Sequence, residues 1–425
     1  MKRLLLSMAA VPLMVGGLSV SASAADGVNI LNDVKMKGEI RPRYETAQVS
    51  QNNKDRANAF TARTHISVTG GLLGVEGLTA TVGLQGVNNF GYTEYAPAKT
   101  NGTKKYDVIA DNQGAMLSEA SVDYTMGKTA LHAGRSQVNL DNQRFIGTVG
   151  WRQMERSYDT IYAADNSVKN LSLLAAYVYG FAGVTGTETT GTNSILLHAA
   201  YTVMPELKIT AYDYMLAVGK QGVDSDTYGL ALTGKVNAGA KLSYRAEYAV
   251  QKDPTMELGT KNLKADADYY NLDLGANISG VLAGVNYELL SGANGSKTTF
   301  KPTLGTNHKF NGWADVFYVS ATPSGGLKDA NVRLGYKAKG FGKVLAVYHN
   351  FTADEKMAAA TTGTTDDLGS EIDVVYANAI PGFKNLKGLV KYASYSKGKA
   401  AEPAGTKATW NHDKSVGWIQ LDYKF

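Results

Sequence analysis

The sequence predicts an all-β fold, a transmembrane antiparallel β-barrel of about 18 strands with long extracellular loops and short periplasmic turns. Three observations predict it. Apolar and polar residues alternate in many segments, short and long connections follow one another along the chain, and the last strand carries an aromatic row. Each strand of such a barrel turns one face to lipid and the other to the lumen.

The composition of the 425 residues excludes several other classes of protein. Without cysteine, the chain has no disulfide framework, thiol catalysis or cysteine-based metal site. A hydrophobic share of 44% is too high for a disordered chain. The 19% of charged residues are spread too evenly among the apolar ones for a bundle of membrane helices. The formal charge is only +5 and the basic residues are spread along the chain, so we expect no nucleic-acid partner.

The first 24 residues have the pattern of a cleaved secretory signal peptide. Lys2 and Arg3 precede an apolar stretch, and the small residues Ala22 to Ala24 form a cleavage site. The alternative is a membrane anchor, but the apolar stretch is near the lower limit of about 18 residues and ends in a cleavage motif. We therefore predict a signal peptide at 1–24 and a single barrel domain at 25–425. An exported chain with no later membrane-spanning helix can be a membrane protein only as a barrel.

Alternation of apolar and polar residues is the main strand signal. From Val34 to Glu45 the even positions are apolar or small and the odd positions are charged, which no helix face can produce. The pattern recurs at 60–69, 78–85, 116–124, 242–251, 270–278 and 331–337. Less regular candidates, each near the ~9–11 residues that a tilted membrane strand needs, occupy 158–165, 170–180, 193–203, 207–217, 226–235, 281–291, 343–353, 369–380 and 387–397.

The connections between these segments indicate which end of the barrel each one joins. Short connections at 126–128, 204–206, 279–280 and 339–342 take turns with long polar ones at 88–114, 137–157, 181–192, 252–266, 292–311, 354–368 and 398–413. With the segment 129–136 between two of these connections, and the last strand, the candidates number 19, whereas bacterial single-chain barrels have an even number of strands. We assign the extra candidate, 312–322, to one long external excursion that ends near Lys328, which leaves 18 strands.

The chain ends on an alternating apolar row that includes Tyr423 and Phe425. We predict that these two residues form the membrane-insertion signal read by the barrel-assembly machinery. The 25 tyrosines fit the same fold, because barrels carry aromatic girdles at both membrane interfaces. The expected lipid partners are outer-membrane lipid and lipopolysaccharide, in the outer membrane of a Gram-negative bacterium.

Few residues suggest catalysis or metal binding. Six histidines are scattered along the chain, and none is spaced with a serine or an acid as a hydrolase would need. Carboxylate pairs such as Asp366 and Asp367 could bind calcium in a loop, but pairs of this kind are usually solvated. We therefore predict that the protein is not an enzyme and has no cofactor, no catalytic residues and no metal site.

The stretch from Gly134 to Asp159 differs from the other connections. It holds four arginines and three acidic residues interleaved with apolar and aromatic ones, whereas an ordinary exposed loop would be richer in Ser, Thr and Gly. Channel proteins narrow their lumen with inward loops and opposed charges. We interpret this stretch as a constriction element, with a solvated external loop as the alternative.

The same stretch resembles the signature of the alginate-export family of outer-membrane barrels, which includes porin-like channels. The similarity lies in Gly134-Arg135, Asp141 to Gly147, Trp151 to Gln153 and Arg156 to Asp159, and two later runs at 307–315 and 348–351 are also similar. The resemblance implies an 18-stranded barrel with a charged constriction built from Arg135, Asp141, Arg144, Arg152 and Asp159.

The leading functional hypothesis is an outer-membrane porin for passive diffusion of small polar or anionic solutes. Its expected constriction and channel lining also include Glu155, Arg156, Arg41, Arg43, Arg63, Arg245, Glu247, Glu371 and Asp373. The alternatives are an exporter of an alginate-type acidic polysaccharide and, less favoured, a barrel enzyme. Acidic and basic residues balance in the predicted lumen, which favours the porin over the exporter. A homotrimer is a further hypothesis.

Overall fold

The structure is a computed structural model. It describes residues 22–23, 29–50, 52–97, 105–219, 224–252, 266–294, 298–318, 322–402 and 409–425. The predicted signal peptide therefore lies outside the described residues except for β1 (Ala22–Ser23), which pairs with β2.

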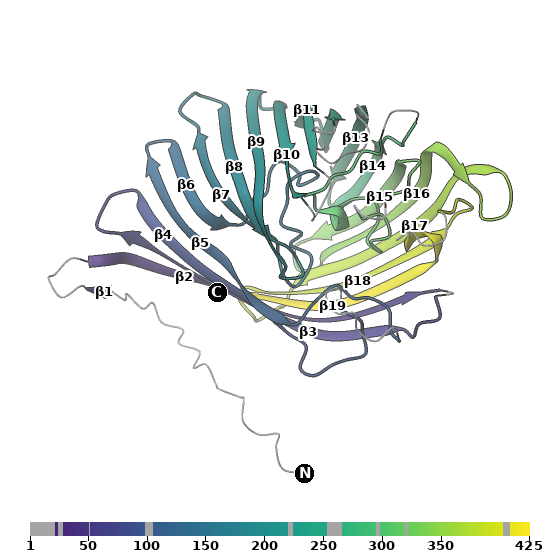
Figure 1. Ribbon diagram of the computed structural model, residues 1–425, viewed down its shortest axis with the longest axis horizontal. Coiled ribbons are helices and arrows are strands. Elements are labelled where there is room, and N and C mark those ends of the chain that lie inside the picture. Colours follow the sequence, from purple (N-terminus) through teal and green to yellow (C-terminus); the bar gives the residue numbers. More distant parts are fainter. Residues whose placement is uncertain are drawn as a thin grey trace, which may run out of the picture.

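The remaining strands form one closed antiparallel barrel. Of the 19 strands in the sheet, all but the two-residue β1 belong to the ring, so the barrel has 18 strands. Each strand pairs with the next along the chain, and β19 closes the ring by pairing with β2 (Figure 1). The strands are β2 (Asn29–Val49), β3 (Ala57–Leu72), β4 (Leu78–Asn88), β5 (Gly114–Met126), β6 (Thr129–Ser136), β7 (Ser157–Asp165), β8 (Leu171–Ala182), β9 (Glu188–Met204), β10 (Leu207–Leu216), β11 (Ser225–Asn237), β12 (Lys241–Lys252), β13 (Asp266–Ile278), β14 (Val281–Leu290), β15 (Leu327–Ala338), β16 (Gly342–Ala358), β17 (Thr364–Ala379), β18 (Leu386–Lys397) and β19 (Lys414–Lys424).

Alternation along each strand gives the barrel two different faces. In β2 the charged residues Arg41, Arg43 and Glu45 point inward and are buried. The outward positions are apolar and open, so that Leu334 is 64% and Leu272 58% exposed. Such a surface would be a liability in water, whereas lipid covers it in a membrane barrel. Among the described residues, no helix is long and apolar enough to cross a membrane.

Most of the tyrosines expected to form the aromatic girdles lie on the outward face, including Tyr201, Tyr248 and Tyr392. Tyr162 does not. It stands opposite His132 in the register of β6 and β7, and the two rings stack with centroids 4.4 Å apart. Because His132 is buried in the wall, Tyr162 belongs to the lumen and not to a lipid-facing girdle.

The short and long connections separate to opposite ends of the barrel, as predicted. We call these ends the short-turn end and the long-loop end. Two predicted long loops are mostly strand, because β8 and β9 leave only 183–187 between them and β16 and β17 leave only 359–363. Threonines near both hairpin tips extend the pairing there, as β-branched residues favour strands. The predicted loop at 252–266 lies almost entirely outside the described residues.

The segment between β14 and β15 corrects one prediction. Its described residues contain no strand, so leaving 312–322 out of the strand count is confirmed. The segment is not an external excursion, however. It turns into the lumen through the 3-10 helix η2 (Asn307–Lys309), and Asn311 donates hydrogen bonds to Glu288 on β14 and Asp329 on β15. Its polar backbone and side chains find partners on the inward face of the wall.

The hydrophobic core lies inside the barrel, towards the long-loop end. Phe145 and Ile146 from one inward segment and Phe300 and Leu304 from the other pack there. They meet inward rings of the wall, among them Tyr212, Tyr269, Phe351, Tyr395 and Trp418. Figure 1 shows these non-strand segments crossing the interior of the ring of strands. The barrel is therefore a filled structure at one end.

Candidate channel constriction

Two inward segments build the site. The first inner segment is 137–156, between β6 and β7, and the second inner segment is 298–318, between β14 and β15. Backbone bonds join them, since Gly147 N donates to Leu304 O at 3.0 Å and Thr306 N donates to Gln143 O at 2.9 Å. A parallel bridge between Ile146 and Leu304 continues this contact. The two segments therefore form one unit inside the lumen.

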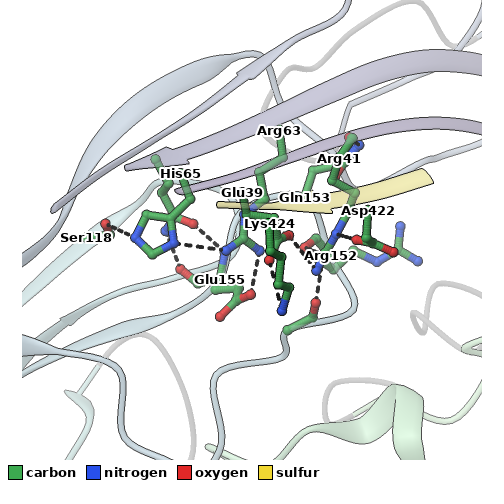
Figure 2. A network of polar contacts seen from close by, with 12 residues as sticks. Glu39, Arg41, Arg63, His65, Ser118, Arg152, Gln153, Glu155, Asp422 and Lys424 are labelled. Atoms are coloured by element: carbon green, nitrogen blue, oxygen red, sulfur yellow. Dashed lines mark hydrogen bonds and ion pairs between the residues drawn. The ribbon is translucent and has the colours of Figure 1, made fainter. Parts of the chain in front are cut away.

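Charged side chains of β2 and β3 hold the first inner segment. Arg41 donates to the carbonyl of Gly150 at 2.9 Å, and Arg43 donates to the carbonyl of Trp151 at 2.5 Å. Arg63 forms an ion pair with Glu155. Figure 2 shows Arg41 and Arg63 pointing from their strands toward the part of the segment that carries Arg152 and Glu155. The arginines of the wall thus bind the backbone and a carboxylate of the loop.

Gln153 adds uncharged contacts at the same place. Its side-chain amide donates to the hydroxyl of Thr61 at 2.8 Å, and its backbone N–H donates to Asp111 at 3.0 Å. Glu155 in turn accepts a hydrogen bond from Gln137 at 3.0 Å, within the first inner segment.

Arg152 joins three parts of the chain. Its guanidinium lies 3.2 Å from Glu45 on β2, 3.8 Å from Asp111 and 3.0 Å from Asp315 of the second inner segment. Burial alone would lower the pKa of Arg152, but the charges of the three carboxylates raise it above its usual value. Arg152 is therefore a permanent cation between the wall and both inner segments.

Arg144 occupies the other side of the first inner segment. It is almost fully buried, lies 2.9 Å from Glu288 on β14, and donates to Asn311 of the second inner segment at 2.9 Å. Its guanidinium also lies over the ring of Phe310, 4.7 Å from the centroid. This arginine fixes the two inner segments to each other and to the wall.

Three further predicted charges lie in the first inner segment and on β12. Asp141 forms an ion pair with Arg245 on β12, and Arg245 lies 2.7 Å from Glu247 on the same strand. Glu247 accepts a hydrogen bond from Tyr212 at 2.8 Å. Arg245 thus bridges the first inner segment and the wall.

Arg135, Asp159 and Arg156 occupy the wall and the root of the first inner segment. Arg135 pairs with Asp159 at 2.6 Å and with Glu188 at 2.7 Å, across β6, β7 and β9. Arg156 donates to the carbonyl of Leu304 at 2.6 Å. The structure therefore brings Asp141, Arg144 and Arg152 into the two-segment unit, and leaves Arg135 and Asp159 together beside it.

Glu371 and Asp373 of β17 lie beneath the second inner segment. Glu371 accepts the backbone N–H of Ala314 at 2.7 Å, and Asp373 accepts that of Trp313 at 3.2 Å. Both carboxylates are buried. The two carboxylates therefore bind backbone N–H groups of 312–322, the segment that was a strand candidate in the sequence.

A buried histidine completes the second inner segment. The Nδ1–H of neutral His308 donates to Asp315 at 2.9 Å, and Nε2 accepts from the ammonium of Lys391 at 2.6 Å. Its ring stacks on Trp151 with centroids 4.5 Å apart. Burial lowers the pKa of His308 to about 3, and the positive charges of Lys391 and Arg152 act in the same direction against the opposing Asp315. Neither His308 nor Lys391 was among the predicted lining residues, although His308 lies in the run 307–315 that resembles the family signature.

A cavity of about 740 Å³ lies between the two inner segments and the strands β12 to β16 and β18. Five cations and three carboxylates line it, together with the amides of Asn271, Asn286 and Asn331; the charged set is Arg245, Lys309, Arg333, Lys343, Lys391, Asp273, Glu288 and Asp329. The lining residues that belong to strands stand at the inward positions of the apolar-polar alternation, so that pattern could have identified them. Lys309 lies in a loop and carried no such signal. Within the described ranges, no group of three or more His, Asp or Glu side chains is arranged to hold a metal ion.

Comparisons with known proteins agree on the fold. No family model and no curated protein matches the chain. Among solved structures, OccAB3 of Acinetobacter baumannii has a TM-score of 0.70 at 14% identity over 92% of this chain and 99% of its own. OccK8 (OprE) of Pseudomonas aeruginosa has a TM-score of 0.67 at 15% identity over 92% and 98%, and OccAB4 of A. baumannii has 0.66 at 15% over 93% and 98%. This chain therefore has the fold of the 18-stranded barrels of outer-membrane porins.

Proposed function

We propose that the protein is a non-enzymatic outer-membrane porin through which small polar or anionic solutes diffuse passively. One observation carries the proposal. Two inner segments enter an 18-stranded barrel from the long-loop end and leave a polar cavity of about 740 Å³ beside them. A barrel of this size would otherwise enclose a wide lumen, so inward segments are the feature that limits the size of a solute.

The charges beside the cavity support a preference for anions. Its lining has five Lys and Arg side chains against three carboxylates, and His308 is neutral at physiological pH because burial lowers its pKa to about 3. Amides along β13 to β15 can donate to and accept from uncharged polar groups. Such a lining suits small solutes with hydroxyl, amide or carboxylate groups.

Single-channel recording in planar bilayers tests the proposal. We expect discrete conductance steps, and a reversal potential in a salt gradient that indicates a mild anion preference. Lys309→Gln removes a cation at the cavity without breaking an ion pair, so it should shift the reversal potential toward cation preference. Lys384→Gln, in the short turn between β17 and β18, is the matched control and should leave the potential unchanged. Absence of conductance would contradict the proposal.

Export of an acidic polysaccharide is the weaker candidate. A polyanion needs a continuous row of free cations, whereas Arg135, Arg144 and Arg152 each have a carboxylate partner within 3.2 Å. The residues of the first inner segment that resemble the alginate-export signature therefore serve to hold this segment in place, and their presence does not require a polysaccharide substrate.

The last strand supports the proposed route of insertion. The outward row of β19 includes the exposed Ile419 and Leu421, and Phe425 exchanges backbone hydrogen bonds with Gly38 of β2 at 2.8 and 3.0 Å. Tyr423 and Phe425 lie next to each other with ring centroids 5.8 Å apart. We include the barrel-assembly machinery, lipopolysaccharide and a homotrimer among the proposed partners, and cross-linking in native membranes tests each.

A further inference from the structure

Lysines gather at the short-turn end of the lumen. They occupy inward positions on strands β10, β11, β12, β15, β16 and β18, close to the short turns. The buried Lys391 bonds to His308. Within the described part of the chain, the ammonium groups of the other six have no ion-pair or hydrogen-bond partner; these free lysines are Lys208, Lys235, Lys241, Lys337, Lys343 and Lys387. These lysines contrast with the arginines of the long-loop end, which are paired.

Two of these lysines face each other directly. Lys337 on β15 and Lys343 on β16 are register partners, two residues before and two residues after the turn that joins the strands. Residues directly opposite on antiparallel strands have Cβ atoms about 4.5–5.5 Å apart, and like charges there destabilise the pair. The arrangement therefore costs stability unless an anion lies between the two ammonium groups.

Two glycines and one arginine of the wall lie close to this pair of lysines. Gly335 stands on the same face of β15 between Lys337 and Arg333, and Gly284 of β14 is the register partner of Arg333. The guanidinium of Arg333 lies over Gly284, within 2.7 Å of where a Cβ would be, and Leu345 packs against Gly335. Arg333 is neutralised by Asp273 at 2.6 Å, so the two lysines supply the unbalanced charge.

The part of the cavity beside Lys343 and Arg333, which we call the recess, is open to solute. Lys343 and Arg333 both line the cavity of about 740 Å³, so an anion in the cavity reaches them. Both lysines are exposed, and their inward position separates them from lipid headgroups. The inner segments lie toward the opposite end of the barrel, so the recess is nearest to the short-turn mouth.

We propose that Lys337 and Lys343 form a second anion-binding site, at the short-turn mouth of the lumen, for a divalent oxyanion such as inorganic phosphate, pyrophosphate or the phosphate group of a small solute. Two ammonium groups on directly opposite strand positions match the two or more negative charges of such a group. Arg333 contributes a planar donor set at the edge of the site. The site adds an anion-binding step to the proposed porin function. Its test by channel block rests on that function, whereas its test by ³¹P line broadening does not.

The experiment measures block of the channel by inorganic pyrophosphate. Pyrophosphate is added to each side of a bilayer in turn, in constant potassium chloride, and single-channel current is recorded. We expect concentration-dependent block that is stronger from one side, because the inner segments stand between the site and the other mouth. Loss of a charge-assisted hydrogen bond to phosphate should raise the half-blocking concentration about tenfold in Lys343→Gln. Lys343→Arg should retain the block.

The double variant Lys208→Gln and Lys235→Gln is the matched control. It removes two inward lysines of β10 and β11 that are not register partners of each other, as the register of Lys208 with Thr233 shows. If it weakens the block as much as Lys337→Gln with Lys343→Gln does, the effect is a diffuse field and the site is refuted. A conducting channel without block also refutes the site and leaves the porin proposal intact.

A second measurement keeps the two proposals apart. If the protein gives no conductance, the porin proposal fails, and broadening of the ³¹P signal of pyrophosphate by the detergent-purified protein then decides the site. Broadening that Lys337→Gln with Lys343→Gln abolishes supports the site. Unbroadened signal with the unaltered protein overturns it.

Discussion

The two ends of the barrel use basic residues in opposite ways. At the long-loop end Arg43, Arg144 and Arg152 are buried and each lies within 4 Å of at least one carboxylate. At the short-turn end Lys235, Lys241, Lys337, Lys343 and Lys387 are exposed and, within the described ranges, have no ion-pair or hydrogen-bond partner. The first arrangement holds segments in place, and the second leaves charge available to a solute.

The choice of arginine or lysine follows from this difference. A guanidinium offers five donors in a plane and loses less on desolvation, so one Arg144 can bond Glu288, Asn307 and Asn311 together. An ammonium is compact and strongly hydrated, which suits a wet wall. Charge therefore specifies how the inner segments dock, while their apolar residues supply the burial that stabilises them.

The largest expected effect comes from breaking the buried pair at the long-loop end. Glu288→Gln leaves Arg144 charged and buried without its carboxylate, and removing one partner of a buried pair costs about 3–5 kcal/mol. We expect the second inner segment to loosen, so that its amides at 298–318 exchange hydrogen faster and the mean single-channel conductance rises.

Two controls make this comparison sharp. Arg144→Met combined with Glu288→Leu removes both charges and should restore most of the lost protection, since apolar replacement of a buried pair is often neutral. Asp273→Asn removes the carboxylate of the part-exposed pair with Arg333, in which each side chain is 28% exposed, and should change stability by no more than about 1 kcal/mol. Equal effects of Glu288→Gln and Asp273→Asn would break the comparison.

Acid should affect the long-loop end through His308. Its pKa is about 3 in the folded protein and about 6.5 in an unfolded chain, so the unfolded chain binds the proton first. The stabilisation is complete above about pH 6.5 and is lost as pH falls toward 3. Burial would raise the pKa of Asp315, but His308 and Arg152 lower it, so its contribution stays complete down to about pH 4.

We therefore expect faster hydrogen exchange at 298–318 as pH is lowered from 7 to 4, after correction for the intrinsic rate. His308→Gln should remove this dependence, because a glutamine amide can donate to Asp315 and accept from Lys391 without titrating. A variant that keeps the full dependence would show that another group is responsible.

The sequence predicted the wall of the barrel well because alternation is a local property. The odd positions of β2 from Lys35 to Glu45 and the row at β19 identified inward and outward faces directly. The composition of 134–159 also singled out the first inner segment, whose charges contact the wall as the structure shows. These signals required only neighbours in sequence.

The second inner segment could not be recognised in the same way. Residues 312–322 were a strand candidate in the sequence, but a local pattern does not report which part of the chain a segment packs against. Here the N–H groups of Trp313 and Ala314 bond to Asp373 and Glu371 and not to a neighbouring strand. The meeting of Arg152 with Asp111 and Asp315 joins parts of the chain that no local pattern relates.

The smallest expected effect is that of removing Lys424, and it tests whether water screens the charges at the short-turn end of the lumen. Lys424 is 68% exposed and lies 3.4 Å from Glu39, which keeps Arg41 at 2.8 Å when the lysine is lost. Lys424→Gln should therefore change the free energy of unfolding by less than about 1 kcal/mol, and salt should reduce even that. Urea unfolding in detergent at low and high salt measures it. A cost above about 2 kcal/mol would mean that the lumen there screens charge as poorly as the buried long-loop end, and the free lysines would then repel one another too strongly to remain charged without a bound anion.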